Sequence, residues 1–479
     1  MPRNRIIYQS EALYCGPSPA TGFMFNGLTT AFSGNFTSGD VGLVTGLGEG
    51  RFNINSRLVG STGVIVGTGL NTGDADFRVV SLVNATKANN FTGLSAGVGA
   101  TGSFLTPLVQ QLHRIQDINY SFTVDRTNVN QFGELAAIDR IILTPPTVSL
   151  DFSYLLSSLA NEKLLGFNVD GTGSAIRNLL NKTSDERNYF IKTVAEGSDA
   201  IGEGNTATDM IGVGNGFLTN YGVEASVGSF PTISVSVEGL NMSFDTGLGA
   251  GAAFLSPAIN PELGARSTAK YSLPIAAGHP GAGDLDISVL RPGDITFSIK
   301  RRDASSDGDT SEPTGNYTSP GQNFDDLADR KIQSFNVALG LDRTPIEKLG
   351  SRFAFSREIN FPIDVTASIE AMVTDLTTGS LSDLINYDDA YNITMNINKP
   401  GENGAASAGS AVKYILKNAK VNSQSFSSSI GANKMVTIEF GTQIGGPNQA
   451  KIGFFMSGNG IDMARVTNSD VKIAGSTVQ

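Results

Sequence analysis

The sequence predicts a mainly β protein with two tandem homologous β-sandwich or barrel domains, each with one flanking short α-helix and a long protruding loop. Two observations lead to this prediction. Residues 114–150 recur without a gap as residues 331–367, and short β-prone runs separated by turn-forming residues make up most of the chain. Many antiparallel strands with few helices are typical of sandwiches and open barrels.

The repeat is the stronger observation. Each match in the second copy lies 217 residues after the first, and twelve residues between 115 and 150 are identical to their counterparts. Chance pairing at ordinary compositions would give about two identities. One structural unit is therefore expected twice. The shared turn and strand positions are Asp125, Arg126, Thr127, Gly133 and Arg140 in the first copy, and Asp342, Arg343, Thr344, Gly350 and Arg357 in the second.

The length also favours two domains, because single hydrophobic cores stop growing at about 250–300 residues and this chain has 479. We expect a first domain with an N-terminal extension, a linker, and a second domain with a C-terminal tail. Their bounds are 1–245 (repeat core 73–245), 246–290, and 291–479 (repeat core 293–442).

Each copy is expected to open with a strand followed by a long loop. The sequence GDADFRVVSLV at 73–83 is echoed by GDITFSIK at 293–300. The loops that follow, at 84–111 and 301–326, are of similar size. Loops this long are uncommon in compact domains unless they have a function. We therefore expect each to extend as a protruding hairpin or arm.

Within each copy, the pattern then predicts a strand, the turn that contains Asp-Arg-Thr, and two strands separated by Pro. A short helix follows, at 174–188 in the first copy and 380–391 in the second, with Ser174 and Ser380 as N-caps. The first copy carries about twelve extra residues before its helix, near NEKLLGFNVDGT.

Two more strands complete each copy. They are expected at 188–194 and 391–397, and then at 227–239 and 430–442, where apolar residues alternate as in a strand with one buried face. Residues 446–479 are a Gly-rich tail with the apolar run IGFFM.

The composition restricts the classes of function. Charged residues make up 16% of the chain, below the ~25% of typical soluble domains, which suggests that much of the surface is buried against neighbours. The net charge of −11 argues against a protein that grips nucleic acid, which needs a basic face. We expect the basic run Lys300-Arg301-Arg302 to pair with a neighbour's carboxylate.

The compartment follows from three expected absences. The single cysteine, Cys15, excludes an intrachain disulfide framework. The sequence has no signal-peptide pattern and no apolar run near 18 residues. We therefore expect no membrane partner and assembly in a cytoplasm.

Residues that could carry chemistry are few. His113 and His279 have no partners at metal-ligand spacing, so no metal and no cofactor are expected. The carboxylates of Asp151 with Glu162, or Asp388 with Asp389, resemble glycosidase pairs in type. The residues that the two copies share are nevertheless structural, so we expect no enzyme.

Two interpretations of the Asp-Arg-Thr turn stay open. The Asp side chain could close an Asx turn while the Arg bridges to a nearby carboxylate, which would be purely structural. Alternatively, the Arg could be held at a contact between subunits.

The run RTNVNQFGELAAIDRIILTPPTVSLDFSY, the duplication and the element order resemble tail-tube (major tail) proteins of long-tailed bacteriophages, in the subset with a duplicated tube domain. The likeness covers about 73–245 and 293–442. The resemblance implies homotrimeric, pseudo-hexameric rings that stack into a tube in the virion tail and contact other tail proteins. DNA would pass through the lumen without specific binding.

Two alternatives remain. The chain could be a baseplate, terminal-ring or neck protein built on the same domain. More remotely, it could be a β-rich carbohydrate-directed surface protein.

Overall fold

The structure is a computed structural model of the chain. It describes residues 11–17, 30–36, 62–68, 76–78, 81–83, 87–89, 97–104, 110–171, 173–180, 185–196, 198, 200, 208–248, 253–261, 264–266, 270–272, 289–301, 332–350, 353–354, 356–372, 390–400, 406–429 and 433–458.

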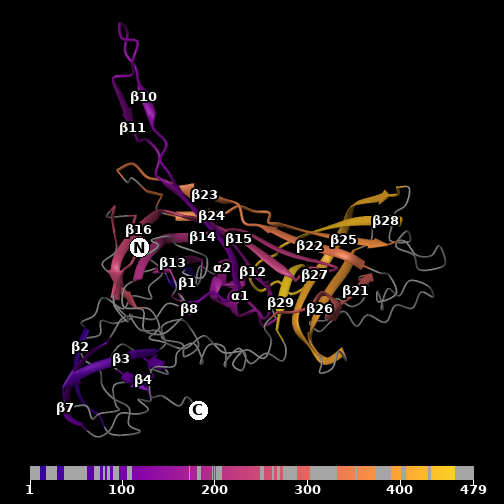
Figure 1. Ribbon diagram of the computed structural model, residues 1–479, viewed down its shortest axis with the longest axis horizontal. Coiled ribbons are helices and arrows are strands. Elements are labelled where there is room, and N and C mark those ends of the chain that lie inside the picture. The colour runs from indigo at the N-terminus through magenta and orange to yellow at the C-terminus, as the bar shows by residue number, and fades with distance from the viewer. Residues whose placement is uncertain are drawn as a thin grey trace.

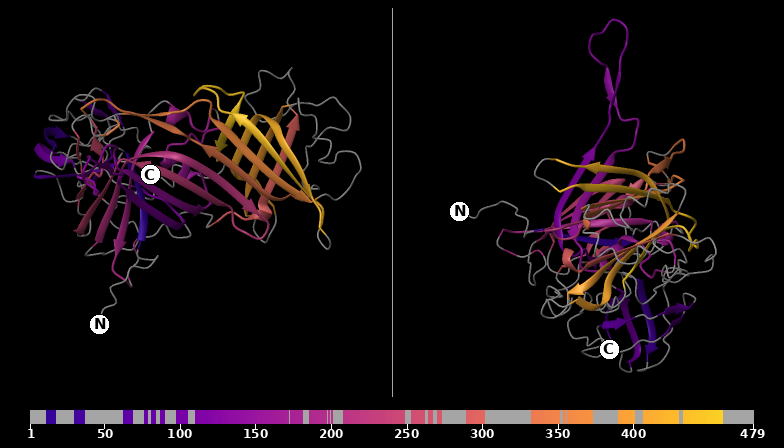
Figure 2. Two further views of the ribbon diagram at one scale, coloured as in Figure 1. Left: turned by 90° about the horizontal axis from the view of Figure 1, so that it is seen from above. Right: turned by 90° about the vertical axis from the view of Figure 1, so that its right-hand side faces the viewer.

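The predicted mainly β fold is confirmed: a fifteen-stranded antiparallel sheet runs through two units that lie side by side (Figure 2). The first unit contains β1 (Glu11–Pro17), β8 (Gln110–Gln111), β9 (Ile115–Thr123), β12 (Thr147–Leu155), α1 (Ala160–Leu165), α2 (Arg177–Leu180), β13 (Glu186–Val194), β14 (Thr208–Ser226), β15 (Thr232–Gly239) and β16 (Asn241–Leu248). The second contains η4 (Pro292–Asp294), β21 (Ile295–Arg301), β22 (Ile332–Gly340), β25 (Asp364–Met372), β26 (Tyr391–Pro400), β27 (Ala406–Ser427), β28 (Met435–Gln443) and β29 (Gly453–Ser457).

The two units have the same strand order. In the first, β9 pairs with β12, β12 with β15, and β15 with the C-terminal half of β14. The N-terminal half of β14 pairs with β13 and β16, and β13 pairs with β1. In the second unit β22, β25, β28, β27, β26, β29 and β21 repeat this arrangement.

The core follows from strand alternation. In β12, Val148, Leu150, Phe152 and Tyr154 point inward and are at most 2% exposed. β25 and β28 show the same pattern. These side chains join one hydrophobic cluster that spans both units. Complete burial of a large apolar side chain is worth about 1.5–3 kcal/mol, so the cluster holds the two units together.

Each unit carries a hairpin between its first two repeat strands. The first is β10 (Thr127–Val129) with β11 (Asp139–Ile141), and the second is β23 (Arg343–Ile346) with β24 (Ser356–Ile359). The β10–β11 hairpin projects far from the body of the molecule, whereas β23–β24 lies against it (Figure 1).

The described part of 84–111 does not form a single long arm. There, β6 (Lys87–Asn89) pairs with β5 (Ser81–Val83), and β7 (Gly97–Phe104) pairs with β2 (Thr30–Phe36) and β3 (Thr62–Thr68). The prediction of one extended arm at 84–111 is therefore wrong for these residues, because they form strands of three different sheets, the last being β8 (Gln110–Gln111) beside β1 in the main sheet. Of the second predicted arm, residues 302–326 lie outside the described residues.

The predicted echo between 73–83 and 293–300 is also wrong. β4 (Asp76–Arg78) pairs with β3 in a four-stranded sheet apart from the main one. β1 takes the place beside β13 that β21 takes beside β26.

Three smaller predictions need correction. Of the predicted helix at 174–188, the described residues form only the single turn α2, and 186–188 already belong to β13. The hydroxyl of Ser174 has no hydrogen-bond partner among the described residues. A second helix, α1, lies in the extra segment of the first copy. The apolar run of the predicted tail forms β29, which is buried against β27. The helix predicted at 380–391 falls almost wholly outside the described residues.

The predicted linker at 246–290 contains ordered strands where it is described. β17 (Ala253–Leu255) pairs with β20 (Lys270–Ser272), and β18 (Ile259–Asn260) pairs with β19 (Ala265–Arg266). No helix in the described part of the chain is long and apolar enough to cross a membrane.

Candidate assembly interface

The two units are joined by a strand pair whose partners lie far apart in the sequence. β14 and β22 pair antiparallel from Asn220 opposite Gly340 to Ser226 opposite Ser334. At the centre, Val223 lies opposite Val337, and the two side chains are 0% and 2% exposed. The β-sheet is therefore continuous from the first unit into the second.

A buried polar cluster lies beside this strand pair. The carboxylate of Glu162 on α1 accepts hydrogen bonds from the hydroxyls of Tyr154 (2.8 Å) and Tyr221 (3.1 Å). The hydroxyls of Tyr221 and Tyr414, the latter on β27, are 3.2 Å apart. Burial raises the pKa of Glu162 to about 7, although the tyrosine hydrogen bonds lower it. This cluster ties α1 and the first unit to the second.

The Arg343 side chain anchors the β23–β24 hairpin on the first unit. Its guanidinium donates to both carboxylate oxygens of Asp185, at 2.5 and 3.1 Å, and to the main-chain oxygen of Leu218 at 3.0 Å. It also lies over the ring of Phe217, 5.1 Å from the centroid. The side chain is 1% exposed, and a bidentate pair with a carboxylate is among the strongest polar contacts in proteins.

A second arginine strengthens this contact. Arg357 on β24 forms an ion pair with Glu238 on β15, and its side chain is 8% exposed. Both arginines are among the residues predicted from the repeat. In the second copy, they make contacts between the two units.

The first-copy arginines have no such contacts. Arg126 and Arg140 are exposed in the β10–β11 hairpin, where the Nε of Arg140 donates to Asn128 at 3.1 Å. The structure therefore separates the two copies of the motif by environment. In the second copy it lies on a neighbouring unit, and in the first copy it faces solvent.

The remaining predicted positions are turn residues. Gly133 and Gly350 have φ values of +92° and +85° in the hairpin tips, a conformation that favours glycine. Thr344 donates to the side chain of Asn360 at 2.7 Å, whereas Thr127 is exposed at the start of β10. Within the described residues, the side chains of Asp125 and Asp342 accept no hydrogen bond, so the predicted Asx turn does not form.

The two units leave complementary strand edges open. Among the described residues, β9 pairs with β12 alone, and the C-terminal half of β27 pairs with β28 alone. Their counterparts, β22 and the C-terminal half of β14, each pair on both sides. The two strand edges that join the units inside the chain thus have unpaired equivalents, β9 on the first unit and β27 on the second.

Side chains on the unpaired strands β9 and β27 are more exposed than their counterparts on the paired strands β22 and β14. Tyr120 and Phe122 on β9 are 36% and 50% exposed, whereas their counterparts Val337 and Leu339 are 2% and 0% exposed. On β27, Phe426 is 49% exposed, whereas Val223 at the same position of β14 is fully buried. Large apolar side chains therefore line both open edges.

The register of this comparison is fixed by a shared irregularity. β14 has a bulge between Leu218 and Asn220, opposite β15, and β27 has one between Val421 and Ser423, opposite β28. Residues of β27 thus lie 203 positions after their counterparts in β14. By this match, the buried pair Val223–Val337 corresponds to Phe426 and Tyr120.

A second shared bulge lies further along the same strands. The backbone N–H of Asn215 donates to the side-chain oxygen of Asn188 at 3.1 Å, and that of Asn418 donates to Asn392 at 3.1 Å. Both Asn215 and Asn418 have left-handed backbones. Sequence reasoning missed these pairs, although the matching Asn positions were a signal for them.

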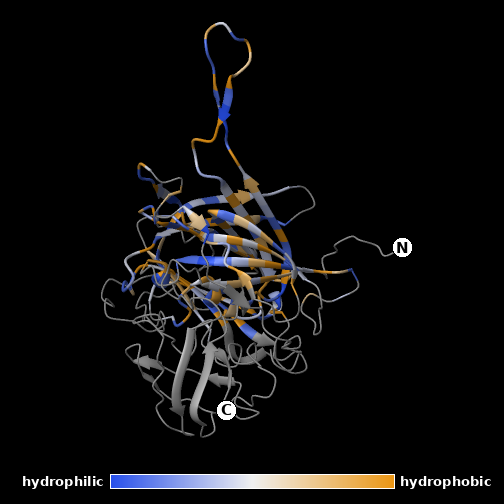
Figure 3. Ribbon diagram, turned by 90° about the vertical axis from the view of Figure 1, so that its left-hand side faces the viewer, coloured by the Kyte–Doolittle hydropathy of each residue, from blue (hydrophilic) through white to orange (hydrophobic). Residues whose placement is uncertain are grey.

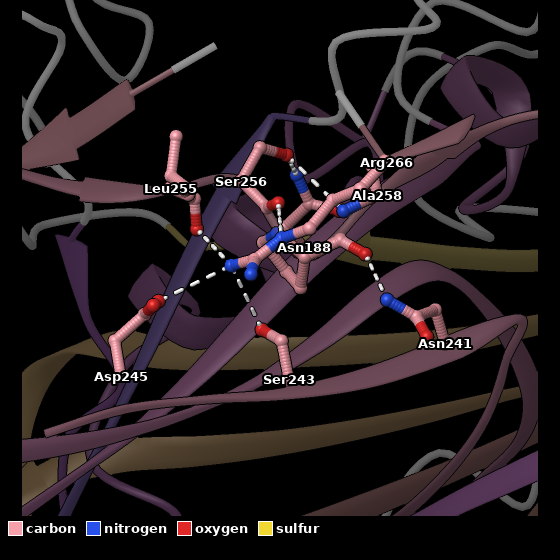
Figure 4. A network of polar contacts seen from close by, with 9 residues as sticks. Asn188, Asn241, Ser243, Asp245, Leu255, Ser256, Ala258 and Arg266 are labelled. Atoms are coloured by element: carbon pink, nitrogen blue, oxygen red, sulfur yellow. Dashed lines mark hydrogen bonds and ion pairs between the residues drawn. The ribbon is translucent and has the colours of Figure 1, made fainter. Parts of the chain in front are cut away.

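In the first unit, the residues predicted as a linker cover this bulge. Figure 4 shows Asn188 beside Ser256, with Arg266 donating to the main-chain oxygens of Ser256 (2.7 Å) and Leu255 (3.0 Å). The same guanidinium reaches Asp245 at 3.2 Å. This segment therefore forms part of the first unit.

The residues that the sequence offered as candidates for catalysis or metal binding lie in packed or hydrogen-bonded positions, or apart from one another. His113 exchanges main-chain hydrogen bonds with the side chain of Asn161. Cys15 is buried, and burial raises the pKa of its thiol to about 11. Asp151 lies on the exposed side of β12, whereas Glu162 is fully buried, so the structure does not bring them together as a catalytic pair.

In the described part of the chain, no three His, Cys, Asp or Glu residues are grouped to hold a metal ion. His279, Asp388 and Asp389 lie outside the described residues.

No protein-family model matches the sequence, and no curated protein does. Solved structures align with parts of it. One is described as the cryo-EM structure of the anti-feeding prophage baseplate, six-fold symmetrised; it has 9% identity and a TM-score of 0.20 over 35% of this chain and 94% of that one. Another, the crystal structure of Hcp protein, has 9% identity and a TM-score of 0.19 over 34% and 98%. Scores this low assign no function.

Proposed function

We propose that this chain is a structural subunit that assembles with copies of itself into closed rings. The observation that carries the proposal is that the β14–β22 contact inside the chain leaves the equivalent edges, β27 and β9, open at opposite ends. A head-to-tail contact of this kind closes into a ring when the rotation per unit divides a full turn. Unpaired apolar edges are otherwise aggregation hazards that proteins cover.

Within such a ring, Phe426 of one copy lies opposite Tyr120 of the next, as Val223 lies opposite Val337 inside the chain. Cross-strand aromatic pairs stabilise antiparallel sheets. Three copies would place six like units around a threefold axis, the homotrimeric, pseudo-hexameric ring implied by the resemblance to tail-tube proteins.

The function that fits best is that of a tail-tube subunit of a bacteriophage tail, with rings stacked into a channel for DNA. The net charge of −11 per chain supports a conduit, since like charge keeps a polyanion from adhering to the wall. Contacts with other tail proteins would then be made at the ends of the tube.

Cysteine cross-linking tests the ring. The register places Ser121 of one copy opposite Ser425 of the next, the counterparts of Ala338 and Gly222. Both serines are exposed, and the native Cys15 is buried. The double variant Ser121→Cys with Ser425→Cys should give closed, disulfide-linked trimers on non-reducing gels.

A matched control is Ser121→Cys with Ser429→Cys, which moves one thiol four residues further, to a position two residues past the end of β27 and up to about 13 Å away. Disulfides need Cα atoms within about 7 Å, so this variant should stay unlinked. Chains that remain monomeric at high concentration would contradict the proposal. Electron microscopy then separates stacked tubes from single rings, which would favour a baseplate, terminal-ring or neck protein.

A further inference from the structure

The two hairpins have the same sequence framework but different surroundings. β23–β24 lies on the first unit, where Arg343 is almost completely buried between Asp185 and the carbonyl of Leu218. Figures 1 and 2 show β10–β11 standing away from the body. Its base residue, Arg126, corresponds to Arg343 and is exposed.

The exposed hairpin is also apolar along one flank, which consists of β11 and the residues next to it. Ile138, Ile141 and Leu143 are 52%, 45% and 70% exposed, and Figure 3 shows apolar residues along the hairpin in orange. At the positions of Ile141 and Leu143, the docked hairpin carries Glu358 and Asn360. An exposed flank of this kind indicates a surface that another protein covers.

We infer that β10–β11 is a clasp that lies across the second unit of the neighbouring copy, as β23–β24 lies across the first unit within the chain. The inference rests on the proposed ring. Once β9 pairs with β27 of the next copy, the base of the hairpin reaches the surface that corresponds to the one holding Arg343. There, Arg126 donates to the main-chain oxygen of Val421, the counterpart of Leu218.

The receiving surface is not identical to the one inside the chain. Lys420 and Gly441 stand at the positions of Phe217 and Glu238. The stacking contact and the second ion pair are therefore absent, so the clasp depends more on its apolar flank. In the sequence, Asp389 stands at the position of Asp185, outside the described residues.

A matched pair of substitutions tests the clasp. Arg126→Ala should leave the melting temperature of the dilute monomer unchanged and raise the concentration needed for half-assembly about tenfold or more, because a hydrogen-bonded charge is lost at the contact. Arg343→Ala should instead lower the melting temperature of the monomer, because it leaves Asp185 without its partner inside the chain.

Limited chymotrypsin digestion gives an independent readout. Phe132 at the hairpin tip is fully exposed, so cleavage near it should be fast in the monomer and slow in single, unstacked rings that carry the engineered disulfide between positions 121 and 425. Cross-linked rings with a cleavable hairpin would overturn the clasp and leave the proposed ring intact. Protection that appears only in stacked rings would also overturn it, because the contact would then be with another ring. If no cross-link forms, both proposals fail.

Discussion

Asn418 on β27 repeats the backbone conformation of Asn215 on β14. Their φ values are 58° and 52°, and each donates its N–H to another asparagine at 3.1 Å. Residues other than glycine adopt this left-handed conformation rarely, and asparagine does so at the lowest cost. The bulge is therefore a conserved part of the repeated unit within this chain, because both copies have asparagine at the position with the left-handed backbone.

We expect Asn418→Ala to lower the free energy of unfolding by about 1–2 kcal/mol, since alanine is strained in this conformation. Asn418→Gly should be closer to wild type, because glycine carries no such strain. Urea denaturation of the monomer measures both values. An alanine variant as stable as the glycine variant would show that backbone strain does not matter here.

Assembly should depend on the exposed aromatic residue of the β27 edge. Phe426→Asp is expected to abolish ring formation while the monomer keeps its stability, because the side chain is half exposed before assembly. Analytical ultracentrifugation with thermal melts separates the two effects. The control is Phe244→Asp on β16, which is exposed but away from the open edge and should assemble normally.

Stability should fall as the pH rises from about 4.5 to about 7. The pKa of Glu162 is raised from 4.5 to about 7 in the folded chain. Below pH 4.5 the carboxyl is neutral in both states, and between 4.5 and 7 it ionises only when the chain unfolds. Folding therefore loses stability across this window, on the order of 3 kcal/mol in total.

Denaturation midpoints at pH 5 and pH 8 test this effect. Glu162→Gln keeps the size and the hydrogen-bond acceptor but cannot ionise, so it should flatten the decline seen in the wild type. A variant with the same pH dependence as the wild type would assign the decline to another group.

The assembled protein is predicted not to bind double-stranded DNA at physiological salt. Phosphate binding needs clustered basic side chains, and the chain has 45 acidic against 34 basic residues. A mobility-shift assay at about 0.15 M salt should show free DNA. Tight binding, or a bore lined by Lys and Arg, would contradict the proposed conduit.

The sequence predicted the duplicated strands well, because the identities at Arg126 and Arg343 or at Gly133 and Gly350 mark hairpins that both units keep. It failed for β1, whose sequence EALYCGP shares no identity with its structural counterpart ITFSIKR in β21. The place of β1 is fixed by pairing with β13, which local sequence does not encode.

The candidate interface was predictable only in part. The repeat identified Arg343 and Arg357, but not that one copy would lie on the neighbouring unit while the other faced solvent. Glu162 was considered as a possible catalytic acid. Its tyrosine partners come from β12 and β14, and Tyr221 in turn meets Tyr414 of β27, so only the folded chain reveals why it is buried.

The pairing of β14 with β22 has a consequence for how rings would grow. Within one polypeptide, this contact forms intramolecularly, at an effective concentration set by the connecting segment and not by the amount of protein. The β27–β9 contact has no such tether and depends on how many copies are present. Half of the junctions are therefore complete before any encounter, and the amount of protein synthesised would determine when the remaining half form.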